Sequence, residues 1–150
     1  MKYLQRNLDR LNNLLYINLQ VKNIYDELIS TTTAEELRIF FTRSSVDLDM
    51  LCSVLEKQIV KLGGEPKQYK SLNRFYKGVL ISLKNNLEDE DAGESLKYKL
   101  CELEELSINS YDAFLEEMHI PLSVCKMLIG QRDKIQQRIY SIRTREILVA

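Results

Sequence analysis

The stretch TAEELRIFFTRSSVDLDMLCSVLEKQIVKLGG, residues 33–64, decides the fold. Its apolar residues and one serine recur at steps of three and four, the period at which side chains share one face of an α-helix. They are Leu37, Phe41, Ser44, Leu48, Leu51, Leu55, Ile59 and Leu62. Thr33 with Glu36 predicts a capping box at the start, and Gly63 predicts a left-handed residue after the end. We therefore expect a helix over 34–62 with one buried face.

The rest of the chain repeats this pattern between a few turn-forming segments. These segments are TTT at 31–33, GGEP at 63–66, EDEDAG at 88–93 and Pro121. The further predicted helices cover about 2–29, 69–87, 92–118 and the residues that follow Pro121. The sequence has no sustained alternation of period two, so the chain is predicted to be all-α.

The predicted helices are arranged along the chain as two αα-hairpins. The connection between the hairpins is about 30 residues long and holds its own short helix, which makes a four-helix bundle with one long crossover. That connectivity is ferritin-like. We expect one domain over 1–150, because a chain of this length buries enough surface to need no disulfide or metal. Cys52, Cys101 and Cys125 lie far apart in the sequence and are expected to be buried thiols.

The charge balance and the hydropathy exclude several classes of partner. The chain has 21 basic and 22 acidic residues, so its net charge of −1 gives no global attraction to nucleic acid or to an anionic membrane. The basic last helix lacks the interleaved aromatic side chains of single-strand nucleic-acid binders. The longest uncharged run, 11–21, is much shorter than the roughly 20 apolar residues of a membrane span, and the charged N-terminus does not fit a secretory signal. We therefore expect a cytoplasmic protein with no nucleic-acid or membrane partner.

Several segments together resemble a known family. They are LGGEP at 62–66, SLNRFYKGVLISLK at 71–84, EDED at 88–91, Glu104 with Tyr111 seven residues later, Pro121 and Gln131. Over nearly its whole length the chain is similar to a bacterial family of uncharacterised ferritin-like four-helix bundles, a domain of unknown function. The resemblance implies the bundle fold, a bacterial cytoplasmic setting and no established activity. The chain departs from the family's pattern at Lys22, where an acidic residue is frequent, and at Asn73, where a histidine is common.

A ferritin-like di-iron site needs more metal ligands than this chain offers. Such a site takes one Glu from each of two helices and a Glu-x-x-His from each of the other two. The only histidine, His119, forms an E-x-x-H motif with Glu116 near the expected end of the fourth helix. The helix dipole favours a histidine at such an end, so we expect a surface or capping role, with metal binding across a symmetric dimer as the alternative. No catalytic, cofactor-binding or metal-binding residue is predicted.

Three polar residues, Asn18, Lys22 and Glu104, are candidates for a buried cluster. Glu104 lies seven residues before Tyr111, and Asn18 lies seven before Tyr25, so the two take equivalent places on helices that we expect to face each other. A buried carboxylate needs a partner, and the predicted partner is Lys22, whose ion pair would fill the volume that a metal fills in active relatives. The alternative is that Lys22 reaches solvent while Glu104 lies at the bundle edge.

The sequence does not determine the biochemical function. We predict a non-enzymatic ferritin-like bundle with an incomplete di-iron site and no cofactor, which acts through an unknown protein partner or as a homodimer. The alternative is a metal-binding ferritin-like oxidase or iron-storage relative. Charge is unevenly spread, since residues 57–86 hold 7 basic and 1 acidic side chains whereas 88–117 hold 11 acidic and 2 basic. Salt bridges within the bundle are the expected result, and docking of a charged partner is the alternative.

Overall fold

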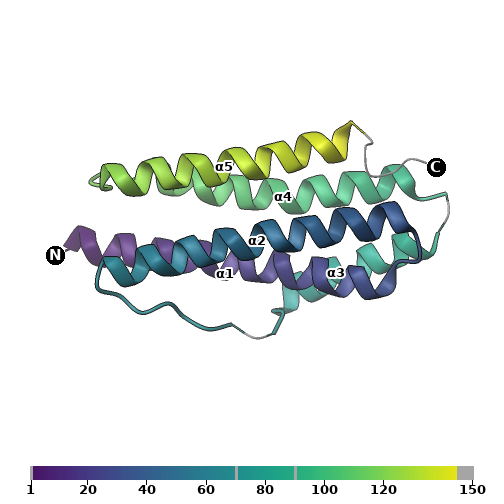
Figure 1. Cartoon of the computed structure of the whole chain (residues 1–150), viewed down its shortest axis with the longest axis horizontal. Helices are drawn as coiled ribbons and strands as arrows, with labels where there is room; N and C mark the ends of the chain where they lie inside the picture. Colours follow the sequence, from purple (N-terminus) through teal and green to yellow (C-terminus); the bar gives the residue numbers. More distant parts are fainter. Residues whose placement is uncertain (1, 70, 90, 145–150) are drawn as a thin grey trace.

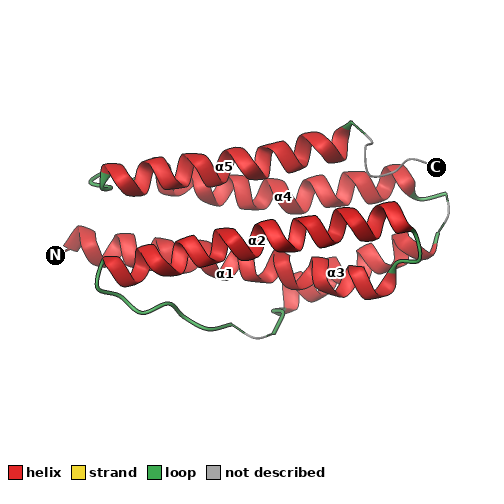
Figure 2. Cartoon of the chain, in the orientation of Figure 1, coloured by secondary structure: helices red, strands yellow, loops and turns green. Residues whose placement is uncertain are grey.

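The chain folds into five α-helices. The computed structural model describes residues 2–69, 71–89 and 91–144, and all regular secondary structure within these ranges is helical (Figures 1 and 2). The helices are α1 (Lys2–Thr31), α2 (Glu35–Lys61), α3 (Arg74–Glu88), α4 (Gly93–Leu115) and α5 (Leu122–Arg143). The all-α prediction is confirmed, and the predicted helix ends agree to within a few residues, except that α3 begins at Arg74 instead of residue 69.

The four longer helices form two hairpins. A short turn at 32–34 joins α1 to α2, and residues 116–121 join α4 to α5. Figure 1 shows that the chain leaves α2 at the left, runs along the lower side of the molecule and enters α3, which leads into α4 at the right. Because the connection returns the chain to the opposite end of the bundle, α2 and α4 run in the same direction.

The end of α2 follows the sequence prediction. Gly63 has a φ of +88°, in the left-handed region that glycine adopts without a steric penalty. The Gly63 amide donates to the Val60 carbonyl and the Gly64 amide donates to the Ile59 carbonyl, each over 2.9 Å. These two bonds are those of a Schellman motif, which satisfies carbonyls that the helix end leaves free.

The start of α2 differs from the prediction. Ala34 is the N-cap residue and makes no side-chain capping bond, so the predicted capping box of Thr33 and Glu36 is wrong. The hydroxyl of Thr32 instead accepts a hydrogen bond from the Ala34 amide over 3.2 Å, one residue earlier than expected. The helix α2 begins at Glu35, so Thr33 lies one residue before the N-cap, the position that the sequence pattern predicts for it.

Residues 62–73, which we call the crossover connection, are held against α1 by a row of polar side chains four residues apart. The first is Asn12, which is buried. Its Nδ2 donates to the Glu65 carbonyl over 3.3 Å, and its Oδ1 accepts from the Lys67 amide over 3.0 Å. One amide side chain thus satisfies both a donor and an acceptor of the connection's backbone.

The next members of this row, Tyr16 and Gln20, hold the residues before α3. Gln20 is fully buried; its Nε2 donates to the Ser71 carbonyl over 3.0 Å and its Oε1 accepts from the Asn73 amide over 2.8 Å. The Asn73 side chain donates to the Tyr16 hydroxyl and also accepts from the Tyr76 amide over 2.9 Å, which makes Asn73 the N-cap of α3. The late start of α3 follows from this cap.

A continuous hydrophobic core fills the space between the helices. Its largest fully buried side chains are Tyr25, Tyr111, Phe41 and Phe114, together with leucines and isoleucines of α1 and α2. Cys52 and Cys101 are buried in it, whereas Cys125 is half-buried, and all three are free thiols. Burial, with a smaller contribution from nearby Glu56, raises the pKa of Cys52 to about 12. Cys52 is therefore a protonated, unreactive thiol at neutral pH.

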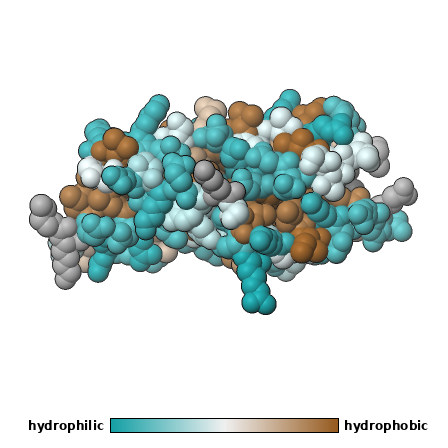
Figure 3. Space-filling view, turned by 90° about the horizontal axis from the view of Figure 1, so that it is seen from below, coloured by the Kyte–Doolittle hydropathy of each residue, from teal (hydrophilic) through white to brown (hydrophobic). Residues whose placement is uncertain are grey.

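The face on the side of the crossover connection is mainly hydrophilic with separate apolar patches. Figure 3, which views the molecule from the side of the crossover connection, shows such patches among polar residues. Within the described ranges, no helix combines the length and the apolar character that crossing a membrane requires.

Candidate functional site

The polar interior of the bundle consists of two layers of side chains from α1, α4 and α5. One layer contains Tyr25, Glu104 and Arg138, and the other contains Asn18, Tyr111 and Gln131. On each helix the two residues lie seven apart, which is two helical turns, so both face the bundle interior. We call these the ion-pair layer and the amide layer.

The ion-pair layer is built around Glu104. The Arg138 guanidinium donates from Nε to Oε2 and from Nη2 to Oε1, the second over 3.1 Å, so both carboxylate oxygens are engaged. The Tyr25 hydroxyl donates to Oε2 over 2.8 Å. The charged side chains are only 1% and 5% exposed for Glu104 and Arg138 respectively. This is a bidentate, charge-assisted pair of the kind that arginine forms with carboxylates.

Burial and charge shift the titration of this layer. Burial lowers the pKa of Arg138, but the adjacent Glu104 carboxylate outweighs it, so the pKa lies above the ordinary value. Burial raises the pKa of Tyr25 well above its ordinary value, and the negative charge of Glu104 raises it further. Tyr25 is therefore a neutral hydrogen-bond donor and Arg138 is a permanent cation.

The amide layer lies two turns away and contains no charge. Asn18 donates from Nδ2 to the Tyr111 hydroxyl and to the Leu14 carbonyl, both over 2.9 Å. The Tyr111 hydroxyl donates to Oε1 of Gln131 over 2.5 Å, and Nε2 of Gln131 donates to the Leu51 carbonyl of α2 over 3.2 Å. This chain of bonds connects all four long helices, while Oδ1 of Asn18 is buried without a partner in the described structure.

The structure corrects the predicted pairing of Lys22. Nζ of Lys22 lies 2.8 Å from Oδ2 of Asp26, one turn further along α1, and the Lys22 side chain is 23% exposed. Oδ1 of the same aspartate accepts from the Ser45 hydroxyl of α2. The predicted ion pair between Lys22 and Glu104 is therefore wrong. Asn18 and Glu104 lie in the two buried layers, and Lys22 lies in neither.

The donor set at the centre does not fit the di-iron site that a ferritin-like bundle implies. Glu104 is the only buried carboxylate among the residues that the structure describes. Its two oxygens are held by a guanidinium, which cannot be deprotonated in proteins and repels a metal cation. No group of three or more His, Cys, Asp or Glu side chains suited to a metal ion occurs in the described parts of the chain.

The E-x-x-H motif does not form a helical pair of ligands. The helix α4 ends at Leu115, so Glu116 is its C-cap and His119 lies beyond it. His119 has a φ of +63°, is exposed, and stacks on Tyr3 at 4.0 Å between ring centroids. The i, i+3 geometry of a Glu-x-x-His pair requires both residues on one helix, which this turn removes.

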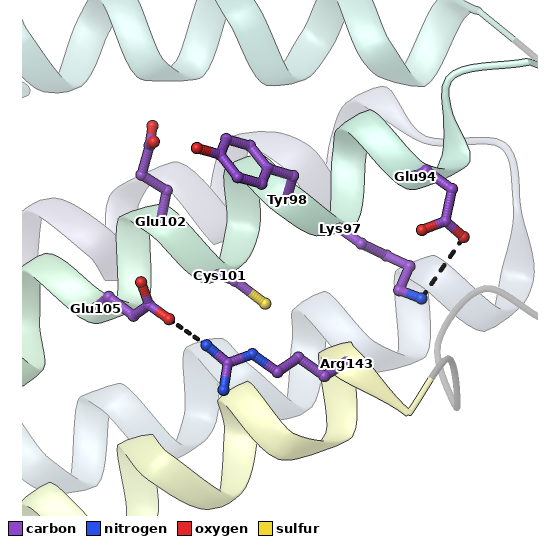
Figure 4. Close-up of a pocket in the computed structure, with 7 residues that line it drawn as sticks. All are labelled: Glu94, Lys97, Tyr98, Cys101, Glu102, Glu105 and Arg143. Carbon is purple, nitrogen blue, oxygen red and sulfur yellow. Dashed lines mark hydrogen bonds and ion pairs between the residues drawn. The ribbon is translucent and has the colours of Figure 1, made fainter.

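A separate pocket of about 440 Å³ lies between α4 and the end of α5 (Figure 4). Its lining residues are Glu94, Lys97, Tyr98, Cys101, Glu102, Glu105 and Arg143. Arg143 pairs with Glu105, and Nζ of Lys97 lies 3.7 Å from Glu94, as Figure 4 shows. Burial raises the pKa of Cys101 despite the adjacent arginine. Both cations of this pocket thus lie beside carboxylates, and Cys101 is a protonated thiol at neutral pH.

Sequence reasoning missed Arg138 as a member of the buried layers, whereas Gln131 was already among the residues that carry the family resemblance. Arg138 and Gln131 lie seven residues apart on the same stripe as Leu128 and Ile135. A basic residue on an apolar stripe is a signal for a buried ion pair, because it is costly to bury unpaired. Arg138 is such a residue, because its side chain is buried and pairs with Glu104.

Comparison with known proteins identifies the family. A family model described as Domain of unknown function (DUF2383) matches residues 6–117, which is well over half of the chain. The matched residues include Asn18, Tyr25, Glu104 and Tyr111, whereas α5 lies outside them. No curated protein matches the chain. The chain belongs to the family described as Domain of unknown function (DUF2383).

Proposed function

We propose that this protein is a ferritin-like four-helix bundle that serves as a non-enzymatic protein-interaction module. The ferritin-like assignment is supported by the connectivity, in which one long crossover joins two hairpins. The interaction role is supported by the chemistry of the interior, where the buried charges of the ion-pair layer are paired with each other and the amide layer contains no charge. Fold alone does not assign a function, so the proposal depends on these side chains.

The observation that carries the proposal is the pairing of Arg138 with Glu104. In a di-iron bundle, inward-facing glutamates bind the metal. Here the guanidinium engages both oxygens of the one inward-facing glutamate. The pair is electrically neutral and satisfied, so it stabilises a closed interior and offers neither a vacant carboxylate nor a free base. The outer faces of the helices are then the surfaces available for function.

Iron analysis tests the closed interior. We expect the chain purified from an iron-supplemented culture to contain far less than one iron per chain, and an anaerobic titration with ferrous iron to show no stoichiometric binding. The matched control is Glu104→Gln, which removes the only carboxylate that is buried among the described residues and should leave these results unchanged. Two irons per wild-type chain that are lost in Glu104→Gln would contradict the proposal.

In-cell crosslinking tests the interaction role. We expect crosslinked adducts whose yield does not change when a membrane-permeant chelator is added, because the binding surface needs no metal. A yield that falls with increasing salt in lysates would match the uneven charge of the chain. Absence of any adduct of higher mass than the 17.6 kDa chain would contradict the interaction role.

A further inference from the structure

An open groove of about 680 Å³ lies between α2 and α5, two helices that are side by side in Figure 1. The helix α2 packs closely against α1 but only loosely against α5, so a hollow remains between α2 and α5. Residues of both helices line this hollow, from Glu36 to Met50 on α2 and from Lys134 to Ser141 on α5. We call it the α2–α5 groove.

Two buried polar residues, Ser44 and Arg138, line the groove from opposite sides. They are only 2% and 6% exposed, respectively. Gln131 of α5 bonds to the Leu51 carbonyl of α2, and the two helices are antiparallel. Arg138 lies seven residues after Gln131, and Ser44 lies seven residues before Leu51, so the two side chains share a level along the bundle. They lie opposite each other in the groove.

Both of these side chains keep a polar atom for the groove. The guanidinium of Arg138 binds Glu104 through Nε and Nη2, while its Nη1 and the Ser44 hydroxyl make no hydrogen bond within the described residues. Oδ1 of Asn18 is the only side-chain polar atom there that is sealed from solvent without a partner, so Nη1 and the hydroxyl are accessible from the groove. Polar groups of such buried residues normally have a partner. The pair therefore marks a place for an acceptor.

The charges around this pair favour a ligand with one negative charge. Three exposed residues within four positions of the pair line the groove, and none of them is in an ion pair within the described parts of the chain: Arg43, Asp47 and Lys134. With Arg138 and the Glu104 carboxylate behind it, three cations stand against two carboxylates. The net charge of +1 matches a monoanion, whereas a dianion would leave excess negative charge beside Asp47.

The groove becomes apolar towards Ser141. Ile39 and Phe40 lie five and four residues before Ser44 on α2, and both line the groove. Ile39 is 44% exposed, and Phe40 is half-buried, with its ring centroid 6.0 Å from that of Tyr25. Five residues of α-helix rise by roughly 7.5 Å. An apolar chain of a few carbon atoms therefore spans the distance from the level of Ser44 to the level of Ile39.

We propose that the α2–α5 groove binds a small monocarboxylate with an apolar tail. Nη1 of Arg138 and the hydroxyl of Ser44 donate to the carboxylate, and Arg43 adds positive charge at the rim. The tail lies along Ile39 and Phe40. The ligand is held by a buried polar pair at one end and by apolar surface at the other, which is the usual composition of a small-molecule site.

The ion-pair layer prepares the donor for this ligand. Glu104 occupies the edge of the guanidinium that carries Nε and Nη2, and the planar group then has a fixed orientation. The edge that carries Nη1 is left for the second carboxylate. A donor that is already oriented loses little freedom on binding, which favours affinity. The inference goes beyond the proposed interaction role and depends on the outer edge of Arg138, not on the absence of a metal from the interior.

An NMR titration of the full-length chain with hexanoate tests the site. We expect one saturable binding event, with shifts of the backbone amides at 39–44 and 137–141. Three further probes each lack one feature of the ligand. Hexan-1-ol has no carboxylate, hexylamine has the opposite charge and acetate has no tail. We expect each of them, and inorganic phosphate, to bind about tenfold more weakly or less tightly still.

Two variants with matched controls test the polar end of the groove. Ser44→Ala should weaken hexanoate binding by about tenfold, because a hydrogen bond to a charged group is lost. Its control is Ser107→Ala on α4, since Ser107 is also 2% exposed but does not line the groove. Arg43→Gln should weaken binding several-fold at low salt and less at high salt. Its control is Arg74→Gln, because Arg74 is exposed on α3 and away from the groove.

Arg43→Gln changes an exposed side chain, so it keeps the test valid if Ser44→Ala lowers the stability of the fold. Absence of hexanoate shifts at 39–44 and 137–141 at every soluble concentration would overturn the inference. Hexan-1-ol that binds as tightly as hexanoate would reject the carboxylate and assign the groove to neutral apolar ligands. Variants that bind hexanoate no differently from their matched controls would reject the polar end of the site.

Discussion

The bidentate contact of Arg138 with Glu104 sets the chemistry of the protein's interior. A buried ion pair is weak evidence for stability, because the desolvation of two charges offsets much of their attraction. Removal of one partner destabilises the folded state more strongly, since the remaining charge is then buried alone. The Tyr25 hydroxyl adds a third polar group that depends on Glu104. The layer therefore behaves as a unit.

Substitution of one member of this layer should be more harmful than substitution of both charged members. We expect Glu104→Gln to lower the free energy of unfolding by about 3–5 kcal/mol, because it leaves the Arg138 cation unpaired. The double variant Glu104→Leu with Arg138→Leu should recover most of that loss. Urea denaturation of the single and double variants measures the coupling, with Tyr25→Phe as a milder control at about 1 kcal/mol. Additive losses in the double variant would contradict a direct pair.

The pKa of Cys52 predicts a loss of stability in alkaline solution. Its folded pKa of about 12 lies above its ordinary value of 9.0, so the folded state retains a proton that the unfolded chain releases. This contribution is fully present below pH 9 and is lost as the pH rises from 9 towards 12. The slope is at most about 1.4 kcal/mol per pH unit for one group.

Denaturation with urea between pH 7 and pH 10.5 measures this effect. The wild-type curve should be flat near neutral pH and should fall above pH 9. The variant Cys52→Ala lacks the thiol and should have a shallower alkaline slope, even though it is less stable overall because of the cavity. The half-buried Cys125 provides the control for the removal of a thiol at a less buried position, in the variant Cys125→Ala. Equal slopes in Cys52→Ala and the wild type would contradict the assignment.

At the scale of single residues, the sequence predicted which side chains face the bundle interior better than it predicted which of them bond to each other. The spacing of seven between Asn18 and Tyr25, and between Glu104 and Tyr111, predicted which residues share a helical face. It did not predict which side chain compensates Glu104, because that depends on the rotation of α5 against α4. Lys22 was the nearest cation along the predicted faces, but Asp26, one turn away on the same helix, binds it first.

The helix ends show which glycines the fold needs. Gly63 terminates α2 with a positive φ, whereas Gly130 lies within α5, where a Cβ would meet no atom within 4 Å. We expect Gly130→Ala to stabilise the protein by about 0.5–1 kcal/mol, because it lowers the entropy of the unfolded chain. Gly63→Ala should destabilise it by about 1 kcal/mol, because alanine is strained at that φ. Thermal unfolding of both variants measures the contrast, and a shift of the same sign in both would contradict it.

The crossover connection depends on Gln20. Gln20→Ala removes the partners of the Ser71 carbonyl and the Asn73 amide, so we expect a loss of about 1–3 kcal/mol. Hydrogen exchange at residues 71–73 should become faster, since the Asn73 amide loses its acceptor. The matched control is Gln5→Ala, because Gln5 is exposed and donates to Asp9 on the same helix. Unchanged exchange at residues 71–73 would show that Gln20 does not hold the connection.

The sequence predicted the bounds of the long helices well, but it predicted neither the contacts of the crossover connection nor the start of α3. Helical periodicity and Gly63 predicted α2 because both are local signals. The helical period assigns no role to Asn12, Tyr16 and Gln20, because their hydrogen-bond partners lie far along the chain, in residues 65–73. The start of α3 was misplaced for the same reason, because its N-cap, Asn73, is fixed by bonds to α1.

Across the whole molecule, the first helices of the two hairpins, α1 and α4, make equivalent contacts with each other. The segments NIYDELI at 23–29 and NSYDAFL at 109–115 are alike. Each segment's tyrosine contacts the residue that lies seven positions before the other tyrosine, since Tyr25 bonds to Glu104 and Tyr111 bonds to Asn18. The family match ends at residue 117, so α5 supplies Arg138 and Gln131 from outside the matched region.

Residues 67 and 68 of the crossover connection are exposed, and this permits a test of the whole assembly. We expect fragments 1–67 and 68–150, produced separately, to associate and to restore the helical circular dichroism of the intact chain. The break falls at exposed residues, and the bonds of Asn12 and Gln20 lie on either side of it. Refolding of the mixed fragments, compared with each fragment alone, measures this, and a mixture no more helical than the sum of its parts would contradict it.

The row of side chains on α1 has a consequence for how this protein tolerates new sequence. Asn12 and Gln20 bind the backbone on both sides of residue 68. A foreign domain inserted at residue 68 would therefore be joined to the protein through two segments that α1 holds in place. Motion of the inserted domain should not disturb the helix packing, and the hydrogen bonds between the connection and α1 should remain. Residue 68 is thus a suitable insertion site for a reporter domain or an affinity tag.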